Sequence, residues 1–412
     1  MRFLAGALII VAAAACTSSP STETTASTVP FSTPSLVVTD QLLAELDLEL
    51  LARSVSRLRQ LDFLQPVSVQ IIADPDYQMR VAELTGGPPD THSRWLQLLG
   101  LLPEGVDAGT ATTRLLQTSV AIYDAEANRV LVRAGAGIDP YVESVVVHEL
   151  VHALQRQHFG AVDTGRLDGD LGYVYTALVD GDAERVARRF IGELSQADEF
   201  AYEEGRLNAS EGAAAIRGGT PGYVFDSLSQ PGGDGVRFLQ GLDYQTVDGF
   251  FADLTELTSL PVSSEAMIIP EADTEIPTLE LPRLSLPSYQ PVQGEGTLGV
   301  GRLRILLGQV LEGQLANPAV LGWAADRLEV HASGEDVVLA YVFLGDRAED
   351  AQELAAAFQS LLDNTLVPGA YGSVRVSDRQ VLVLAASDSS QEAELDEIYG
   401  DFGDEVFLVP LG

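Results

Sequence analysis

The chain of 412 residues contains no lysine, so arginine supplies all 24 of its basic side chains. Its 60 acidic side chains leave a formal net charge of −36, which excludes nucleic acid as a partner because the phosphate backbone would be repelled. Hydrophobic residues are plentiful, and at 46% they are enough for a large buried core in two or three domains. The chain is therefore globular, and nothing in its composition sets an oligomeric state.

Cysteine is nearly absent as well, and the single one, Cys16, cannot form an internal disulfide. It follows a short positive region at Arg2 and an apolar run over residues 3–12, which is too short for a comfortable membrane span. Ala13, Ala14 and Ala15 together with Cys16 resemble the lipobox of bacterial lipoproteins. We therefore expect residues 1–16 to be a lipoprotein signal peptide ending in a lipid-modified cysteine, with ordinary secretion or an uncleaved anchor as the alternatives. The lipid would anchor the protein to the cell membrane on its extracytoplasmic face.

Serine, threonine and proline dominate residues 17–38. A stretch of this composition cannot build a core, so we interpret it as a flexible tether between the lipid anchor and the folded part. The folded part begins near residue 39, where leucines start to recur at three- and four-residue steps, as in a helix that packs on one face.

The pattern His-Glu-x-x-His lies at the centre of an apolar stretch over residues 145–154. Asp139 and Pro140 supply an N-cap and a proline at the first helical position, and Gly160 supplies a stop, so a helix of about five turns is predicted. Valine, leucine and alanine surround the pattern on nearly every side, so this helix should be buried for most of its length. Buried histidine and glutamate are costly unless they are hydrogen-bonded or bound to a metal.

His148 and His152 are four residues apart and therefore share one face of the predicted helix. That spacing lets two imidazoles reach one tetrahedral zinc ion, whereas Glu149, rotated by about 100°, faces a zinc-bound water instead of the metal. We interpret these residues as two metal ligands and a general base. A metal-free remnant of such a site and a chance pattern are the alternatives.

A catalytic zinc site needs a third protein ligand. His158 follows at the spacing that metzincins use, but Gln155 stands where their helix-breaking glycine would be. On a continuing helix, His158 points away from the face of His148, so we interpret it as a structural hydrogen-bonding residue near the site. A second helix, predicted over residues 171–194, offers acidic side chains instead.

Two segments together resemble a gluzincin-like family of zinc metallopeptidases found as surface lipoproteins of bacteria and archaea: residues 148–159 (HELVHALQRQHF) and residues 177–183 (ALVDGDA). The second helix of that family carries a Glu-Gly-Asp-Ala pattern whose glutamate would be the third zinc ligand. Asp180 occupies this place here, so the resemblance implies that Asp180 completes the zinc site. Glu184 lies one turn further on the same side of the helix and is the alternative third ligand.

Two regions outside the helices have strand patterns. Alternating apolar residues predict a β-hairpin over residues 119–133, directly before the His-Glu-x-x-His helix. Such a hairpin can pair with an extended peptide substrate or can simply cover the core. From residue 328 onward, two strands, a helix, two more strands and a final helix predict a small ferredoxin-like α+β unit.

The sequence thus predicts an α+β protein with a mainly helical zincin-like metallopeptidase domain and small β-hairpin over residues 39–285. A C-terminal helical and α+β domain follows over residues 286–412. We expect the protein to hydrolyse a peptide or protein substrate through a zinc-bound water, with Glu149 as general base. The alternative is a catalytically inactive surface lipoprotein that keeps the zincin fold and binds a partner, which Asp180 in place of glutamate favours.

Overall fold

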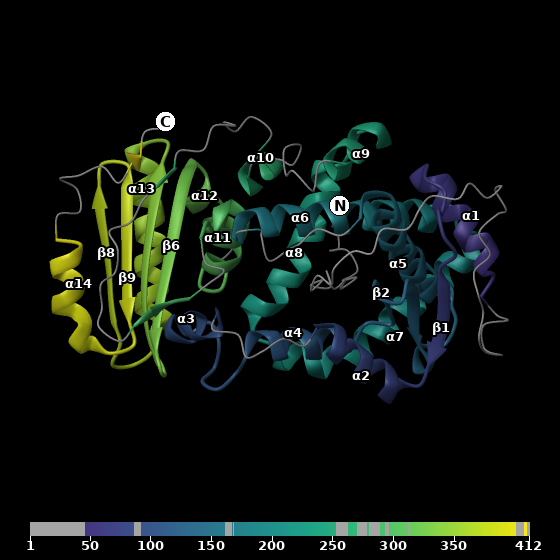
Figure 1. Cartoon of the computed structure of the whole chain (residues 1–412), viewed down its shortest axis with the longest axis horizontal. Coiled ribbons are helices and arrows are strands. Elements are labelled where there is room, and N and C mark those ends of the chain that lie inside the picture. The colour runs from purple at the N-terminus through teal and green to yellow at the C-terminus, as the bar shows by residue number, and fades with distance from the viewer. Residues whose placement is uncertain are drawn as a thin grey trace, which may run out of the picture.

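The computed structural model describes residues 46–85, 92–160, 167, 169–252, 263–269, 278–279, 289–292, 296–311, 313–400 and 408–409. The predicted signal peptide with Cys16 and the tether over residues 17–38 lie outside these ranges. The fold is α+β, with helices at one end of the long axis and a five-stranded sheet at the other (Figure 1). Across the described ranges, no helix combines the length and the apolar character needed to span a membrane.

The first part of the chain is mainly helical, and at its centre α6 packs against both α5 and α8. Its elements are α1 (Leu48–Arg59), β1 (Ser68–Ile72), α2 (Asp74–Thr85), α3 (His92–Leu98), α4 (Ala108–Leu116), β2 (Ala121–Asp124), β3 (Arg129–Arg133), α5 (Pro140–Phe159), α6 (Gly169–Ile191), α7 (Gln196–Gly219), α8 (Gly222–Phe238), α9 (Tyr244–Ala252) and α10 (Ser264–Ile268). The long helices α5, α6 and α7 therefore form most of the scaffold around the His-Glu-x-x-His pattern.

The predicted hairpin before α5 is confirmed. Strands β2 and β3 pair in antiparallel register, and β3 pairs in parallel with β1, which gives the order β1-β3-β2. The turn between β2 and β3 ends at Asn128, whose φ of 48° lies in the left-handed region that asparagine tolerates. Strand β2 is an edge strand, and α5 lies against it.

The second part of the chain carries the larger sheet, in the antiparallel order β5-β6-β7-β9-β8. Its elements are β4 (Thr278–Leu279), β5 (Gln290–Pro291), α11 (Gly299–Leu307), α12 (Gly313–Val320), β6 (Trp323–Ser333), β7 (Asp336–Gly345), α13 (Ala348–Thr365), β8 (Tyr371–Ser377), β9 (Gln380–Ala386), α14 (Glu392–Ile398) and β10 (Leu408–Val409). The predicted order of two strands, a helix, two strands and a helix is confirmed.

The connectivity of this sheet differs from the ferredoxin-like prediction. A ferredoxin-like unit places a helix directly after its first strand, whereas here β6–β7 and β8–β9 are two hairpins joined side by side through β7 and β9. Tight turns cause the difference, because Gly334 and Asp378 adopt φ values of 61° and 48°, which close each hairpin without room for a helix.

Both faces of this sheet are covered, so strand β7 is apolar on both sides. Leu339, Tyr341 and Phe343 belong to the same core as α13, and the Tyr341 ring lies 5.2 Å from that of Phe358. The alternate residues Val338, Ala340 and Val342 belong to a second core with α14. The period of two along a strand explains this division.

One hydrophobic core continues from the helical part into the sheet, through α11, which contacts α6, α8 and β6. Asp170 in the first turn of α6 accepts a hydrogen bond from the backbone of Ser264 at 3.0 Å, and the Ser264 hydroxyl accepts one from Gly301 at 2.9 Å. Residues on the two sides of the predicted boundary between residues 285 and 286 therefore share one core.

Helices α6 and α8 approach each other closely at two glycines. A β-carbon on Gly235 would lie 1.7 Å from the backbone oxygen of Ala177, and one on Gly181 would lie 2.5 Å from the Gly235 backbone. Glycine in a helix costs roughly 1 kcal/mol relative to alanine, and the close packing offsets this cost. The contact fixes the position of Asp180, the residue before Gly181, relative to α8.

Candidate metal centre

Helix α5 has the predicted boundaries. The Asp139 side chain accepts a hydrogen bond from the Val142 backbone at 2.9 Å, Pro140 occupies the first turn, and the helix ends at Gly160, which has a φ of 79°. The predicted burial is also confirmed, because His148 and Glu149 are each only 1% exposed. Local sequence signals therefore place the His-Glu-x-x-His pattern inside the protein.

The structure brings His148, His152 and Asp180 together between α5 and α6. One ligand atom from each residue lies within 4.8 Å of the other two, and all three residues are buried. The Nε2 atom of His152 is 3.8 Å from Oδ1 of Asp180. This group can hold a metal ion.

Several polar atoms of the three residues have no hydrogen-bond partner, which fits a bound cation. Among the buried atoms of the described ranges, both ring nitrogens of His148, Nε2 of His152 and Oδ1 of Asp180 have no hydrogen-bond partner. Each such atom costs about 1–3 kcal/mol when it is left unsatisfied, and one ligand atom from each residue lies within 4.8 Å of the other two, so the arrangement is unfavourable without a ligand. Two imidazoles and one carboxylate are a donor set that zinc accepts.

Burial also sets the protonation of this group. Burial, together with the neighbouring His152, lowers the pKa of His148 well below its ordinary value. Burial lowers the pKa of His152 to about 4, so both imidazoles are neutral near pH 7 and have lone pairs to donate. Burial, followed by the charge of Glu184, raises the pKa of Asp180 well above its ordinary value. The contact between His152 and Asp180 is therefore no ion pair by itself, and a cation would favour the charged carboxylate.

The side chain of Glu149 reaches the hairpin. Its Oε2 accepts a hydrogen bond from the backbone N–H of Tyr123 in β2 at 2.7 Å. Burial raises the pKa of Glu149 to about 8, the bond from Tyr123 opposes this shift, and the charge of Asp180 adds to it. A carboxyl group that titrates close to neutral pH suits a general base. The same bond occupies an outward-facing amide of the edge strand, so an extended peptide would have to compete with Glu149 for it.

Glu184 lies beside the metal-compatible group. Its Oε2 is 3.9 Å from Nδ1 of His148, and its Oε1 accepts a hydrogen bond from Arg188 at 2.6 Å. The group whose ligand atoms converge contains Asp180 and not Glu184. Glu184 is thus placed next to one histidine, one helical turn beyond Asp180.

His158 lies outside the group, at the far end of α5. Its Nε2 atom is 2.7 Å from the backbone oxygen of Asp62, in a partly exposed position. This contact agrees with the predicted structural role of His158. The continuing helix explains it, because ten residues of α-helix turn the side chain away from His148.

Gln155 is a residue of the site that the sequence analysis missed. Its Oε1 lies 2.9 Å from Nδ1 of His152, and its Nε2 donates to the Val179 oxygen and to Oδ2 of Asp182, both at 3.0 Å. Because the amide nitrogen points to α6, the amide oxygen must accept from Nδ1–H, which leaves Nε2 of His152 facing Asp180. The available signal was the three-residue spacing from His152, which puts both side chains on one helix face.

A buried arginine of α1, Arg59, binds Asp182, which also accepts a hydrogen bond from Gln155. Arg59 donates from Nε to Oδ2 of Asp182 at 2.7 Å and from Nη2 to Oδ1 of Asp248 at 2.6 Å. The side chains of Arg59 and Asp182 are both 0% exposed, and the guanidinium lies 4.6 Å from the centre of the Tyr244 ring. Polar partners of this kind orient metal-binding histidines in known sites. No local pattern links Arg59 to Asp182, which is 123 residues away.

Comparisons with known proteins concern mainly the other end of the chain. Residues 289–409 match the model of a family described as a domain of unknown function, DUF8575. The match contains the five-stranded sheet, covers less than half of the chain and does not include α5 or α6. No curated protein and no solved structure matches this chain. The interpretation of the metal centre therefore rests on its geometry and on the resemblance of its motifs.

Proposed function

We propose that this protein is a zinc-dependent metallopeptidase of the gluzincin-like family, with a zincin-like helical domain in which His148, His152 and Asp180 hold the zinc ion. The observation that carries the proposal is the convergence of their buried, unpartnered ligand atoms. Three protein ligands leave one position of a tetrahedral site open, as in catalytic zinc centres. When bound there, zinc supplies a Lewis acid and lowers the pKa of water.

The chain's own residues supply the rest of the chemistry. Glu149 takes a proton from the attacking water and passes it to the leaving amine, and the Tyr123 amide holds its carboxylate in place beforehand. Gln155 keeps His152 in the tautomer that binds through Nε2. The surrounding valines and leucines exclude bulk water, which strengthens the electrostatic interactions inside the site.

The proposed location is the extracytoplasmic face of the cell membrane, where a lipid on Cys16 would anchor the protein and peptides or proteins would be its substrates. The support is the order of a short apolar run, a lone cysteine and a Ser/Thr/Pro tether. Wild-type protein should partition into detergent, and Cys16→Ser should release it or leave the signal unprocessed. Soluble wild-type protein with an unmodified cysteine would contradict the anchor.

A catalytically inactive surface lipoprotein that keeps the zincin fold is the second candidate, and two observations favour it. Glu149 is 1% exposed and already hydrogen-bonded to the hairpin, and Glu184 stands 3.9 Å from His148, where a fourth protein ligand would close the metal site. Closed sites with four protein ligands are structural. In that case the metal would stabilise a binding module.

Metal analysis and cleavage assays test the proposal together. Purified protein should bind about one zinc ion per chain, and His148→Ala or Asp180→Ala should lose it. The matched control is His158→Ala, which changes a histidine of the same helix that lies outside the group. Zinc-loaded protein should cleave unfolded proteins, and chelation should stop cleavage. Zinc binding without cleavage of any member of a broad peptide library would favour the binding module.

A further inference from the structure

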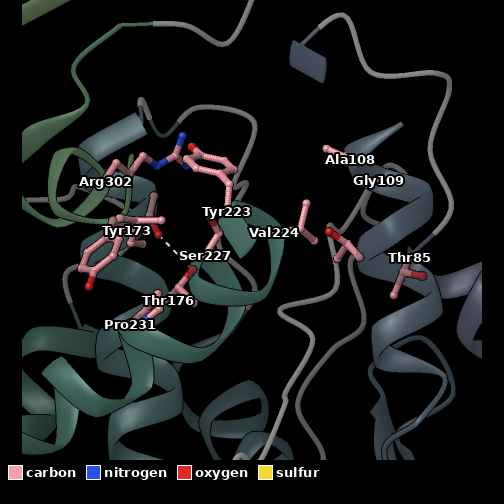
Figure 2. A pocket seen from close by; sticks show the side chains of 13 residues that line it. Thr85, Ala108, Gly109, Tyr173, Thr176, Tyr223, Val224, Ser227, Pro231 and Arg302 are labelled. Carbon is pink, nitrogen blue, oxygen red and sulfur yellow. Dashed lines mark hydrogen bonds between the residues drawn. The ribbon is translucent and has the colours of Figure 1, made fainter. Parts of the chain in front are cut away.

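One concave site of the described structure includes none of the three residues of the metal-compatible group. It is a cavity of about 250 Å³ between α4, α6, α8 and α11. Figure 2 shows Gly109 of α4 on one side and Ser227 of α8 and Arg302 of α11 on the other. The volume is below that of cavities that enclose a drug-sized ligand, so this one suits the end of a chain rather than a whole molecule.

Among the described residues that line this cavity, Arg302 is the only charged one. Within the described ranges, its guanidinium has neither an ion-pair partner nor a hydrogen-bond partner. Its neighbour Arg304, on the same helix, is paired with the buried carboxylate of Asp234. The chain has 60 acidic and only 24 basic side chains, so an arginine without an acidic partner is unexpected. Its charge makes the cavity locally positive.

Hydroxyl groups complete the polar lining. Within the described part of the chain, the hydroxyls of Thr112 and Ser227 also lack hydrogen-bond partners. A guanidinium offers a planar fork that matches a carboxylate, and a hydroxyl can donate to either carboxylate oxygen. The single positive charge of Arg302 balances one negative charge and the hydroxyls only donate hydrogen bonds, so the lining fits a carboxylate better than a doubly charged phosphate.

The cavity also lies close to the metal group along α6. Thr176, which lines the cavity, is one turn before Asp180 and on the same helix face, about 6 Å away along the axis. Pro231 lines the cavity from α8, and the next residue, Gly232, packs against the β-carbon of Asp180. A ligand that reaches Thr176 in the cavity would therefore lie about one turn of α6 from the metal-compatible group, a distance that a short peptide can span.

We propose that this cavity binds a carboxylate of a short peptide, with Arg302 as its charged partner and Ser227 and Thr112 as hydrogen-bond donors. The peptide nature of the ligand rests on the proposed function, whereas the carboxylate rests on the cavity alone. The carboxylate can be the C-terminus of the peptide or an acidic side chain, because both present the same two oxygens.

Calorimetric titration of three peptides tests this proposal with full-length, zinc-loaded Glu149→Gln protein, which leaves the peptides intact. The probes are acetyl-trialanine with a free C-terminus, the same peptide as its amide, and acetyl-Ala-Asp-Ala amide. The free acid should bind at least tenfold more tightly than the amide. Binding of the aspartyl peptide would identify a side chain as an equally good source of the carboxylate, and its failure to bind would identify the C-terminus.

Arg302→Gln should abolish the preference for the free acid, and Ser227→Ala should reduce it. The control is Arg327→Gln, an exposed arginine of β6 that lies outside the lining. Equal binding of acid and amide, binding of inorganic phosphate alone, or an Arg302→Gln variant that still prefers the acid would overturn the proposal. Binding is measured without turnover, so a protein that cleaves nothing but still binds the free acid would contradict only the peptidase.

Discussion

Asp326 in the five-stranded sheet and Asp180 in α6 are both 5% exposed, yet their surroundings differ. Asp326 accepts hydrogen bonds from the backbones of Leu298 and Gly299 and the side chain of Trp323, each at 2.8 Å, and from the Tyr341 hydroxyl at 3.3 Å. Through these bonds, Asp326 ties the first turn of α11 to the sheet.

Oδ1 of Asp180 is buried without a hydrogen-bond partner, as are both ring nitrogens of His148 and Nε2 of His152, and one ligand atom of each residue lies within 4.8 Å of the other two. Burial raises the pKa of both aspartates, to about 6 for Asp326, where the four hydrogen bonds oppose the shift. The comparison shows that burial alone does not mark a functional carboxylate. Asp180 differs from Asp326 in that the protein leaves one of its buried oxygens unsatisfied and places a ligand atom of each histidine within 4.8 Å of the carboxylate.

The largest expected effect is on catalysis. Glu149→Gln keeps the size of the side chain but removes the base, so the rate of peptide cleavage should fall by about 10²–10⁴-fold, or about 3–5 kcal/mol in activation free energy. Zinc content should stay unchanged, because Glu149 is not in the metal-compatible group. Loss of zinc in this variant would mean that Glu149 is itself a ligand.

The next prediction compares the two aspartates directly in metal-free protein. Asp326→Ala leaves four donors without their acceptor, so the free energy of unfolding should fall by about 4 kcal/mol, roughly 1 kcal/mol for each bond. Asp180→Ala should leave stability unchanged or raise it, since it removes an unsatisfied buried group. Urea denaturation with a chelator present measures both. Similar losses in the two variants would refute the distinction drawn here.

Gln155→Met should weaken zinc binding by about 10–100-fold, because His152 loses the partner that orients it. The matched control is Gln157→Met, on the same helix, which loses hydrogen bonds to residues 64 and 65 but does not touch His152. Competition with a chromogenic chelator gives the affinities. If both variants bind zinc equally well, Gln155 is only a packing residue.

The smallest effect concerns Glu184. Glu184→Gln should change zinc affinity less than Asp180→Asn does, by at least tenfold, because Asp180 is part of the converging group and Glu184 is not. Both substitutions keep the shape of the side chain. A reversed order would place the third ligand one turn further along α6 and would favour the closed, non-catalytic site.

Much of the site's local structure could be predicted, because it depends on short-range signals. The cap at Asp139, the proline at position 140 and the stop at Gly160 define α5, and the four-residue spacing puts both histidines on one face. The hairpin of β2 and β3 followed from alternation of apolar residues, and it was found where expected. The choice between Asp180 and Glu184 stayed open because both lie on the same face of α6.

The ferredoxin-like prediction was wrong although the order of elements was right. Periodicity shows where strands and helices occur, but strand pairing depends on how tightly each turn closes, and the left-handed residues Gly334 and Asp378 form hairpins. The role of Gln155 was missed for a related reason. Its partners Val179 and Asp182 come from a different helix, so only packing brings them together.

The sequence by itself determined the helix that carries the His-Glu-x-x-His pattern, because capping and helical periodicity act within a few residues of the chain. The tertiary structure alone decided which side chains surround that pattern. The glycine contact between α6 and α8 sets the position of Asp180 relative to α8, and Arg59 donates a hydrogen bond to Asp182, which is 123 residues away in the sequence. Such contacts depend on how whole helices pack, and no local pattern encodes the distance between two helix axes.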